Sequence, residues 1–254
     1  MCAIMKRAFH QQGLIVASFF VLALPALRAQ SDEPNVETLL QQMEAAYSVA
    51  RSYSDTSSVR FRNPDEGDGA RVEFKIWFSR PKFIRIDATS RRAPDAPSKR
   101  EVMWFDGDTA RMWSSTSPVV TRGEIQLAGS KMFGSYAYHI PTLLEASYAG
   151  PRRLHQLTSP SIAGEETIED VACYHLHGDW QGDAYDIWIG KEDHLVRKIV
   201  ANYSGYLMEE LHRAIVVNQP MDMTVFRFAP ENEVRGPTKE GTPPPRLPGE
   251  RTRP

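Results

Sequence analysis

The sequence has 254 residues, of which 24% are charged, and its 30 Lys and Arg nearly balance its 32 Asp and Glu. This balance argues against a nucleic acid or an anionic membrane surface as the main partner. Because Cys2 and Cys173 are the only two cysteines, a small disulfide scaffold is excluded and the core depends on apolar burial.

The first 29 residues are typical of a secretory signal peptide. Lys6 and Arg7 precede an apolar run over residues 13–27, and Ala29 is a small residue suited to cleavage. An uncleaved membrane anchor is the alternative, but the run is shorter than the roughly 20 residues that span a bilayer. We therefore expect an exported protein. Its mature form keeps only Cys173, which we interpret as a small packed hydrophobe rather than a nucleophile.

Residues 36–50 carry apolar side chains at helical spacing, which predicts an amphipathic helix with one buried stripe. Asp32 or Asn35 can cap its start, and Pro34 is tolerated in a first turn.

From Tyr53 onward the apolar period changes to two, which predicts strands. The first series covers residues 57–62, 71–79, 82–89, 101–106 and 109–115. The second covers residues 152–158, 162–168, 171–178, 184–190, 194–203, 205–217 and 224–230. About eleven short strands in meander order, without alternating helices, favour one antiparallel sheet that curls into a barrel or half-barrel.

Between the two series, residues 139–148 predict a short apolar helix inserted into the sheet protein. Pro141 suits a first turn, and Leu143, Leu144 and Tyr148 fall on one side. The concave face of the sheet is the nearest apolar surface that could cover this side. Residues 231–254 are rich in proline and polar side chains, so we expect a disordered tail there, with a proline-motif ligand as the alternative.

Motifs of known enzyme classes are mostly lacking, and the sequence contains no G-x-S-x-G, phosphate-binding glycine loop or H-E-x-x-H. His175 and His177 would share one face of a strand, a spacing that could hold a metal. No third ligand can be assigned, so we interpret them as solvent-facing and predict no metal, no cofactor and no enzymatic activity.

Large apolar residues are in excess on the first series of strands, on both faces. One interpretation is a well-filled barrel core. The other is a cavity between sheet and lid helix that takes an acyl chain or a hydrophobic segment. We predict the cavity, with this lining: Phe74, Ile76, Phe78, Ile84, Ile86, Met103, Phe105, Met112, Leu143 and Leu144.

The chain resembles the periplasmic carriers of outer-membrane lipoproteins (LolA-like), together with the related lipoprotein receptors and sensor domains of sigma-factor regulators. The resemblance rests on the order of VETLLQQMEAAYSVARSYSDTSSVRFR, FKIWFSRPKFIRIDA, VMWFDGDTARMW, HIPTLLEAS, ACYHLHG, YDIWIGKEDHLVRKIV and AIVVNQPMDMTVFRFAP. It covers about residues 35–230. The insertion at residues 114–137, the longer loop at 90–99 and the tail depart from it, which favours a paralogue.

This resemblance implies an unclosed antiparallel half-barrel around an N-terminal helix and a lid helix. It also implies that Arg80 latches the lid by hydrogen bonds to lid carbonyls. Pro81 would then end the sheet ladder at a hairpin corner, where its missing N–H costs nothing. The alternative for Arg80 is a solvent-exposed turn arginine.

We therefore expect a signal peptide at residues 1–29, a lipid- or lipoprotein-binding domain at 30–230 and the tail at 231–254. The expected function is a periplasmic carrier that holds lipoprotein acyl chains or another lipid. Its partners would include inner- and outer-membrane components of lipoprotein sorting. The alternative is an envelope-stress sensor that binds a membrane regulator and lipoproteins.

Overall fold

The computed structural model describes residues 34–63, 67–93, 95–132, 137–148, 150, 153–203 and 205–230. The expected signal peptide and Pro-rich tail lie outside these ranges. Within the described part of the chain, no helix is long and apolar enough to cross a membrane.

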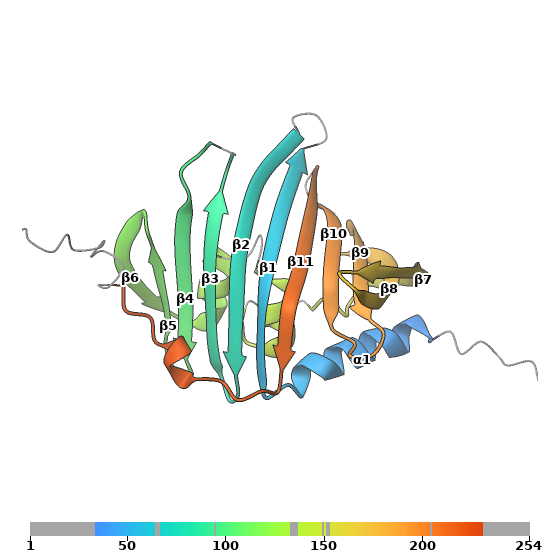
Figure 1. Ribbon diagram of the computed structural model, residues 1–254, viewed down its shortest axis with the longest axis horizontal. Helices are drawn as coiled ribbons and strands as arrows, with labels where there is room; N and C mark the ends of the chain where they lie inside the picture. Colours follow the sequence, from blue (N-terminus) through green and yellow to red (C-terminus); the bar gives the residue numbers. More distant parts are fainter. Residues whose placement is uncertain are drawn as a thin grey trace, which may run out of the picture. The chain divides into compact units, whose positions relative to one another are not determined.

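Eleven strands form one antiparallel sheet in the order β6-β5-β4-β3-β2-β1-β11-β10-β9-β8-β7 (Figure 1). Over the described residues the sheet is open, because β6 and β7 stand at opposite ends of this order. The predicted mainly β, unclosed half-barrel is therefore confirmed. The strands are β1 (Ser52–Asn63), β2 (Gly67–Ser79), β3 (Phe83–Arg91), β4 (Lys99–Asp106), β5 (Ala110–Ser114), β6 (Ser117–Gly123), β7 (Thr158–Ile168), β8 (Val171–Trp180), β9 (Asp183–Gly190), β10 (Val196–Tyr203) and β11 (Tyr206–Val217).

The helices are α1 (Val36–Ser48), α2 (Ile125–Met132), α3 (His139–Leu144) and the 3-10 turn η1 (Met223–Phe226). The first of them confirms the predicted amphipathic helix. The Asn35 side chain accepts a hydrogen bond of 2.8 Å from the backbone N–H of Glu37, and the apolar stripe of α1 is buried. In Figure 1, α2 and α3 lie behind the sheet, whereas η1 lies in front of β3 and β4.

The two faces of the sheet bury different clusters. The inner face packs against α1, α2 and α3 in the main apolar core. On the outer face, Trp104 and Trp113 form a second cluster with Phe228 of the C-terminal segment. The ring centroid of Phe228 lies 5.1 Å from that of Trp104 and 5.3 Å from that of Trp113. Part of the apolar excess on the first strands is therefore covered by this segment and not by the lid helix.

Three elements differ from the sequence predictions. Residues 153–157 form one turn, at 154–155, with irregular backbone on either side instead of a strand. The strand predicted at residues 224–230 begins inside η1, where Asp222 accepts a 2.9 Å hydrogen bond from the N–H of Thr224. The expected insertion contains both β6 and α2. Pro118 hides the strand pattern of β6, and an edge strand tolerates such a proline.

Candidate functional site

The ten residues predicted to line a cavity lie on β2 to β5 and on α3, and the structure brings them into the main apolar core. Nine of them are buried, and Met112 is partly buried against the same cluster. Alternation along the strands directs these side chains to the face that the helices cover. In this conformation the predicted lining is closed to solvent, and its binding role stays a prediction.

Helix α3 is part of the helical cover of this apolar face, together with α1 and with α2, which packs on β4 and β5. All six residues of α3 are buried, and no side-chain hydrogen bond caps its start at Tyr138. The hydroxyl of Thr142 donates to the carbonyl of His139 at 2.8 Å, and the hydroxyl of Tyr148 donates to the carbonyl of Ala137 at 3.0 Å. A six-residue helix is not stable alone, so α3 depends on its packing and on contacts with the sheet.

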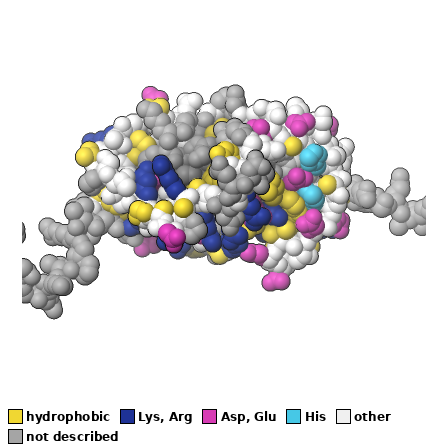
Figure 2. All heavy atoms as spheres, turned by 90° about the horizontal axis from the view of Figure 1, so that it is seen from above, with side chains coloured by type: hydrophobic (Ala, Val, Ile, Leu, Met, Phe, Trp, Pro, Cys, Tyr) yellow, Lys and Arg dark blue, Asp and Glu magenta, His cyan; other side chains and the backbone are white. Residues whose placement is uncertain are grey.

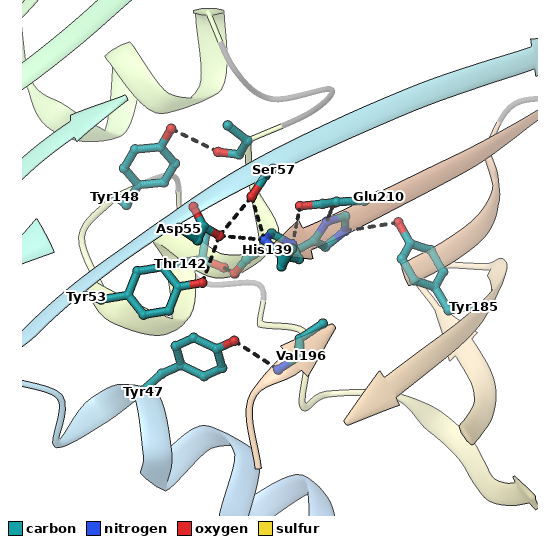
Figure 3. A network of polar contacts seen from close by, with 12 residues as sticks. Tyr47, Tyr53, Asp55, Ser57, His139, Thr142, Tyr148, Tyr185, Val196 and Glu210 are labelled. Atoms are coloured by element: carbon teal, nitrogen blue, oxygen red, sulfur yellow. Dashed lines mark hydrogen bonds and ion pairs between the residues drawn. The ribbon is translucent and has the colours of Figure 1, made fainter. Parts of the chain in front are cut away.

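Beneath α3 the core contains a cluster of four ionisable side chains (Figure 3). His212 Nδ1 lies 2.7 Å from Asp55 Oδ2 and 2.8 Å from Ser57 Oγ. His212 Nε2 lies 3.0 Å from Glu210 Oε1, an ion-pair distance without hydrogen-bond geometry. His139 Nδ1 of α3 lies 2.6 Å from Glu210 Oε2. The side chains of Asp55, Glu210 and His212 have no solvent exposure, so each carboxylate depends on an imidazole as its partner.

The contacts within the cluster favour the charged forms of Glu210 and His212. Burial by itself lowers the pKa of His212, but the hydrogen bond to Asp55 and the contact with Glu210 outweigh it and raise that pKa to about 9. Burial by itself raises the pKa of Glu210, but His139 and His212 outweigh it and lower that pKa to about 2. The Glu210–His212 pair is therefore ionic over the whole neutral range.

Three tyrosines surround the cluster. The hydroxyl of Tyr53 donates to Asp55 Oδ2 at 2.8 Å, and burial, followed by the charge of Asp55, raises the pKa of this phenol. The hydroxyl of Tyr185 lies 3.4 Å from His139 Nε2. The hydroxyl of Tyr47 accepts a 3.0 Å hydrogen bond from the N–H of Val196 and so ties α1 to β10.

Ser57, His212 and Asp55 are the residue types of a hydrolase triad, but their geometry differs from one. In such a triad the acid and the hydroxyl use opposite ring nitrogens. Here Asp55 and Ser57 both contact Nδ1 of His212, and Nε2 faces Glu210. The three residues are also buried. This arrangement holds charges in place and does not activate the serine.

The sequence reasoning missed this cluster. Met208, Glu210 and His212 alternate along β11 and face the core, while Leu207 is exposed and Leu211 is only partly buried. A search for the apolar face of β11 selects Leu207 and Leu211, but these two residues lie on the face that points away from the core. The detectable signal was the pair of titratable residues two apart on a central strand, because such residues must share one face.

The predicted contact of Arg80 with the lid helix is wrong in this structure. Arg80 Nη2 donates to the carbonyl of Ser48 at 2.7 Å, and Nε donates to the carbonyl of Ala50 at 3.2 Å. These acceptors lie at the end of α1, where helix carbonyls lack partners within the helix. Arg80 is exposed and lies with Pro81 in the turn between β2 and β3, where the proline was expected. Its guanidinium carbon lies 4.8 Å from the ring centroid of Phe78.

His175 and His177 meet Asp186 on the neighbouring strand. Their ring nitrogens lie 2.8 Å and 3.1 Å from Asp186 Oδ1. The ring of His175 also stacks on Trp188, with centroids 4.2 Å apart. In Figure 2, histidine and acidic side chains lie together toward this end of the sheet. No group of three or more His, Cys, Asp or Glu in the described ranges could hold a metal ion.

Comparison with known proteins gives one family. A family model described as "predicted periplasmic protein (DUF2092)" matches residues 36–235. No curated protein matches the sequence.

Several solved structures are similar to the chain. LprF from Mycobacterium bovis is 12% identical, with 74% of this chain and 94% of that chain covered and a TM-score of 0.49. A LolA superfamily protein from Nitrosomonas europaea is 9% identical, with 77% and 98% covered and a TM-score of 0.39. The complex of MucA and MucB from Pseudomonas aeruginosa contains a chain that is 11% identical, with 78% and 62% covered and a TM-score of 0.39.

Proposed function

The chain belongs to the family of predicted periplasmic proteins DUF2092, and from this premise we propose that it is a non-enzymatic carrier that binds lipid acyl chains between its sheet and α3. The proposal includes export by the signal peptide at residues 1–29, a binding domain at 30–230 and a tail at 231–254. Lipoprotein acyl chains are the proposed cargo, and membrane components of lipoprotein sorting are the proposed partners.

The observation that supports this function is the apolar inner face of β2 to β5, which is buried under helices that include the six-residue α3. Moving α3 away from the sheet would expose Leu143 and Leu144, which are both buried. An acyl chain inserted between α3 and the sheet would keep both apolar surfaces out of water. Each buried methylene contributes roughly 0.8 kcal/mol, so one chain can offset the lost packing.

The test is a chain-length series of fatty acids, measured with the purified mature protein by displacement of a fluorescent acyl probe. Affinity should rise about four-fold with each added methylene until the space is filled, because the hydrophobic contribution grows with buried length. Native mass spectrometry of protein purified from the periplasm should also show a co-purifying lipid. An affinity that does not depend on chain length overturns the proposal.

A matched pair of variants locates the binding surface. Leu143→Ser places a hydroxyl on the buried side of α3 and should weaken acyl binding about ten-fold. Leu127→Ser makes the same change on α2, where the side chain is 47% exposed, and should leave binding unchanged. Equal effects of the two substitutions would place the ligand elsewhere.

A further inference from the structure

The buried cluster beneath α3 contains one carboxylate oxygen without a hydrogen-bond donor. Asp55 Oδ2 accepts hydrogen bonds from the hydroxyls of Tyr53 and Ser57, at 2.8 Å each. The same oxygen lies 2.7 Å from His212 Nδ1, and in Figure 3 the dashed lines at Asp55 all end on this atom. Among the described residues, none donates to the other oxygen, Oδ1. The side chain of Asp55 has no solvent exposure, so bulk water does not reach Oδ1 either.

An atom in this position is unfavourable for the protein alone. Burial removes the oxygen from water, and within the described part of the chain no hydrogen bond replaces the one that is lost. Buried polar groups of this kind are few in native proteins, and each requires an explanation such as a functional role. A carboxylate oxygen accepts hydrogen bonds, so the partner that fits Oδ1 is an O–H or N–H group.

Asp55 stands beside the apolar lining that we predict for the acyl chain. In the register of β1 and β2, Asp55 lies opposite Ile76, and Ser57 lies opposite Phe74. The ring of Phe74 also meets the ring of His212 edge to face, with centroids 6.5 Å apart. The inner face of the sheet therefore changes from apolar on β2 to polar on β1 and β11. Small-molecule sites in proteins combine a large apolar surface with a few placed polar groups in this way.

An irregularity in the sheet lies next to Asp55. The register of β1 against β11 shifts here, so that two residues of β11, Ala214 and Ile215, stand against Asp55 alone. The shift allows His212 and Ile215 both to contact the core, although they are three positions apart in one strand. Ala214 takes a φ of 48°, in the left-handed region that is unfavourable for alanine. Bulges of this kind redirect side chains and are frequent beside functional sites.

The charges around Asp55 favour a neutral donor. His212 already contacts the carboxylate, and its pKa is raised to about 9, so it is an imidazolium at neutral pH. A cationic headgroup at Oδ1 would be repelled by this imidazolium and would lose its hydration on burial. An anionic headgroup without a donor would bring a further negative charge to Asp55. A neutral O–H or N–H group avoids both costs.

We propose that Asp55 Oδ1 accepts a hydrogen bond from a neutral O–H or N–H group of the bound lipid, close to where its acyl chain begins. This inference rests on the proposed acyl-binding function and names the ligand class: an acyl lipid with a free hydroxyl or with an N-acyl amide. When α3 moves away from the sheet, the donor reaches Oδ1 and the chain lies along Phe74 and Ile76. A chain without a donor leaves Oδ1 unpaired.

The test compares ligands that differ by a methyl group in place of the donated hydrogen. 1-Dodecanol is compared with 1-methoxydodecane, and N-methyldodecanamide with N,N-dimethyldodecanamide, by displacement of a fluorescent acyl probe from the purified mature protein. The donor should bind about ten-fold more tightly, because it satisfies the buried acceptor. The added methyl group by itself favours the compound without a donor, so it cannot produce this preference.

The two pairs distinguish the two sources of the donor. A preference for the alcohol alone assigns a hydroxyl lipid, and a preference for the secondary amide alone assigns an N-acyl amide. A preference in both pairs supports a donor site that accepts either group. Equal affinity within both pairs overturns the proposal.

Asp55→Asn should remove the preference, so that the ratio of affinities within each pair falls to about one. Three donors surround the position of Oδ2, so the amide oxygen stays there and the NH₂ group takes the position of Oδ1, where it cannot accept. Asp87→Asn is the matched control, because it makes the same change on the outer face, at a carboxylate that accepts from Arg85 and Arg100. It should keep the preference. An unchanged ratio in Asp55→Asn overturns the proposal, and if this variant does not fold, the wild-type ratios decide.

A series of 1-decanol, 1-dodecanol and 1-tetradecanol separates this inference from the function on which it rests. Affinity that rises with chain length, without a preference for the donor, keeps the carrier function and overturns the role of Asp55. Affinity that does not depend on chain length overturns the carrier function, and the inference with it.

Discussion

His139 Nδ1 on α3 and Glu210 Oε2 on β11 lie 2.6 Å apart, although 71 positions separate the two residues in the chain. This contact joins the short cover helix to the centre of the sheet. The partner of His139 belongs to a buried charged cluster, so α3 cannot move away without leaving Glu210 short of a hydrogen bond. Opening of the inner face is therefore coupled to the charges beneath it.

His139→Gln should loosen α3. The amide can still donate a hydrogen bond to Glu210, but it loses the ring contacts of His139 with Trp180 and Tyr185, whose centroids lie 5.4 Å and 5.7 Å away. We expect the amide hydrogens of α3 to exchange about ten-fold faster, measured by mass spectrometry. His177→Gln, at a side chain that is 51% exposed, is the control. Unchanged exchange in α3 would show that packing alone holds the helix.

Stability should depend on pH through the buried cluster. The pKa of His212 is raised from 6.5 to about 9, so its contribution is complete below pH 6.5 and is lost as the pH rises through 9. The pKa of Glu210 is lowered from 4.5 to about 2, so its contribution is complete above pH 4.5 and is lost as the pH falls through 2. Unfolding in urea at a series of pH values should give the highest stability between pH 4.5 and 6.5.

The control for this pH profile is His212→Gln. It leaves Asp55 and Glu210 buried with less compensation, which should cost about 3–5 kcal/mol. It should also flatten the decline of stability toward pH 9. If the variant keeps the alkaline decline of the wild type, another group causes it.

Arg80→Gln should destabilise the end of α1 and not release the lid helix. The substitution weakens donation to the carbonyls of Ser48 and Ala50, and because the arginine is exposed we expect a loss of about 1 kcal/mol in the free energy of unfolding. Hydrogen exchange should increase in the last turn of α1. Lys82→Gln in the same turn should change neither quantity. Faster exchange in α3 and not in α1 would restore the predicted lid latch.

Gly129→Ala should destabilise the protein even though alanine is the better helix former. In an isolated helix the substitution gains about 1 kcal/mol. In α2 the new Cβ would lie 2.7 Å from the carbonyl oxygen of Tyr148 and 3.0 Å from its ring, which is closer than packing allows. We expect a net loss of about 1–3 kcal/mol by chemical denaturation. A gain in stability would show that α2 can move away from Tyr148.

The sequence predicted the sheet, α1 and the hairpin corner at Pro81, because these depend on local periodicity and turn chemistry. It did not reveal α2, whose apolar positions are few and interrupted by Gly129. The sequence also could not identify the hydrogen-bond acceptors of Arg80. Which carbonyls lie near its side chain depends on where the end of α1 lies in the folded chain.

The buried cluster was not predicted for a different reason. Asp55 and His212 are 157 positions apart, and only the pairing of β1 with β11 places them together. Periodicity identifies which residues share a face, but not which polar residues meet across two distant strands. Such a cluster becomes visible once the strand order is known.

The pairing of β1 with β11 has a consequence for folding. Tyr53 stands opposite Val217, so the first strand finds this neighbour only after almost all of the domain has been synthesised. The strands β1 to β6 and the strands β7 to β11 can each form as local hairpins, but the two half-sheets become one sheet only at this late seam. Seams between such distant segments form slowly. Until then, the edges of both half-sheets remain open to wrong partners, so a chaperone that shields β1 would protect this chain more than one that shields any other strand.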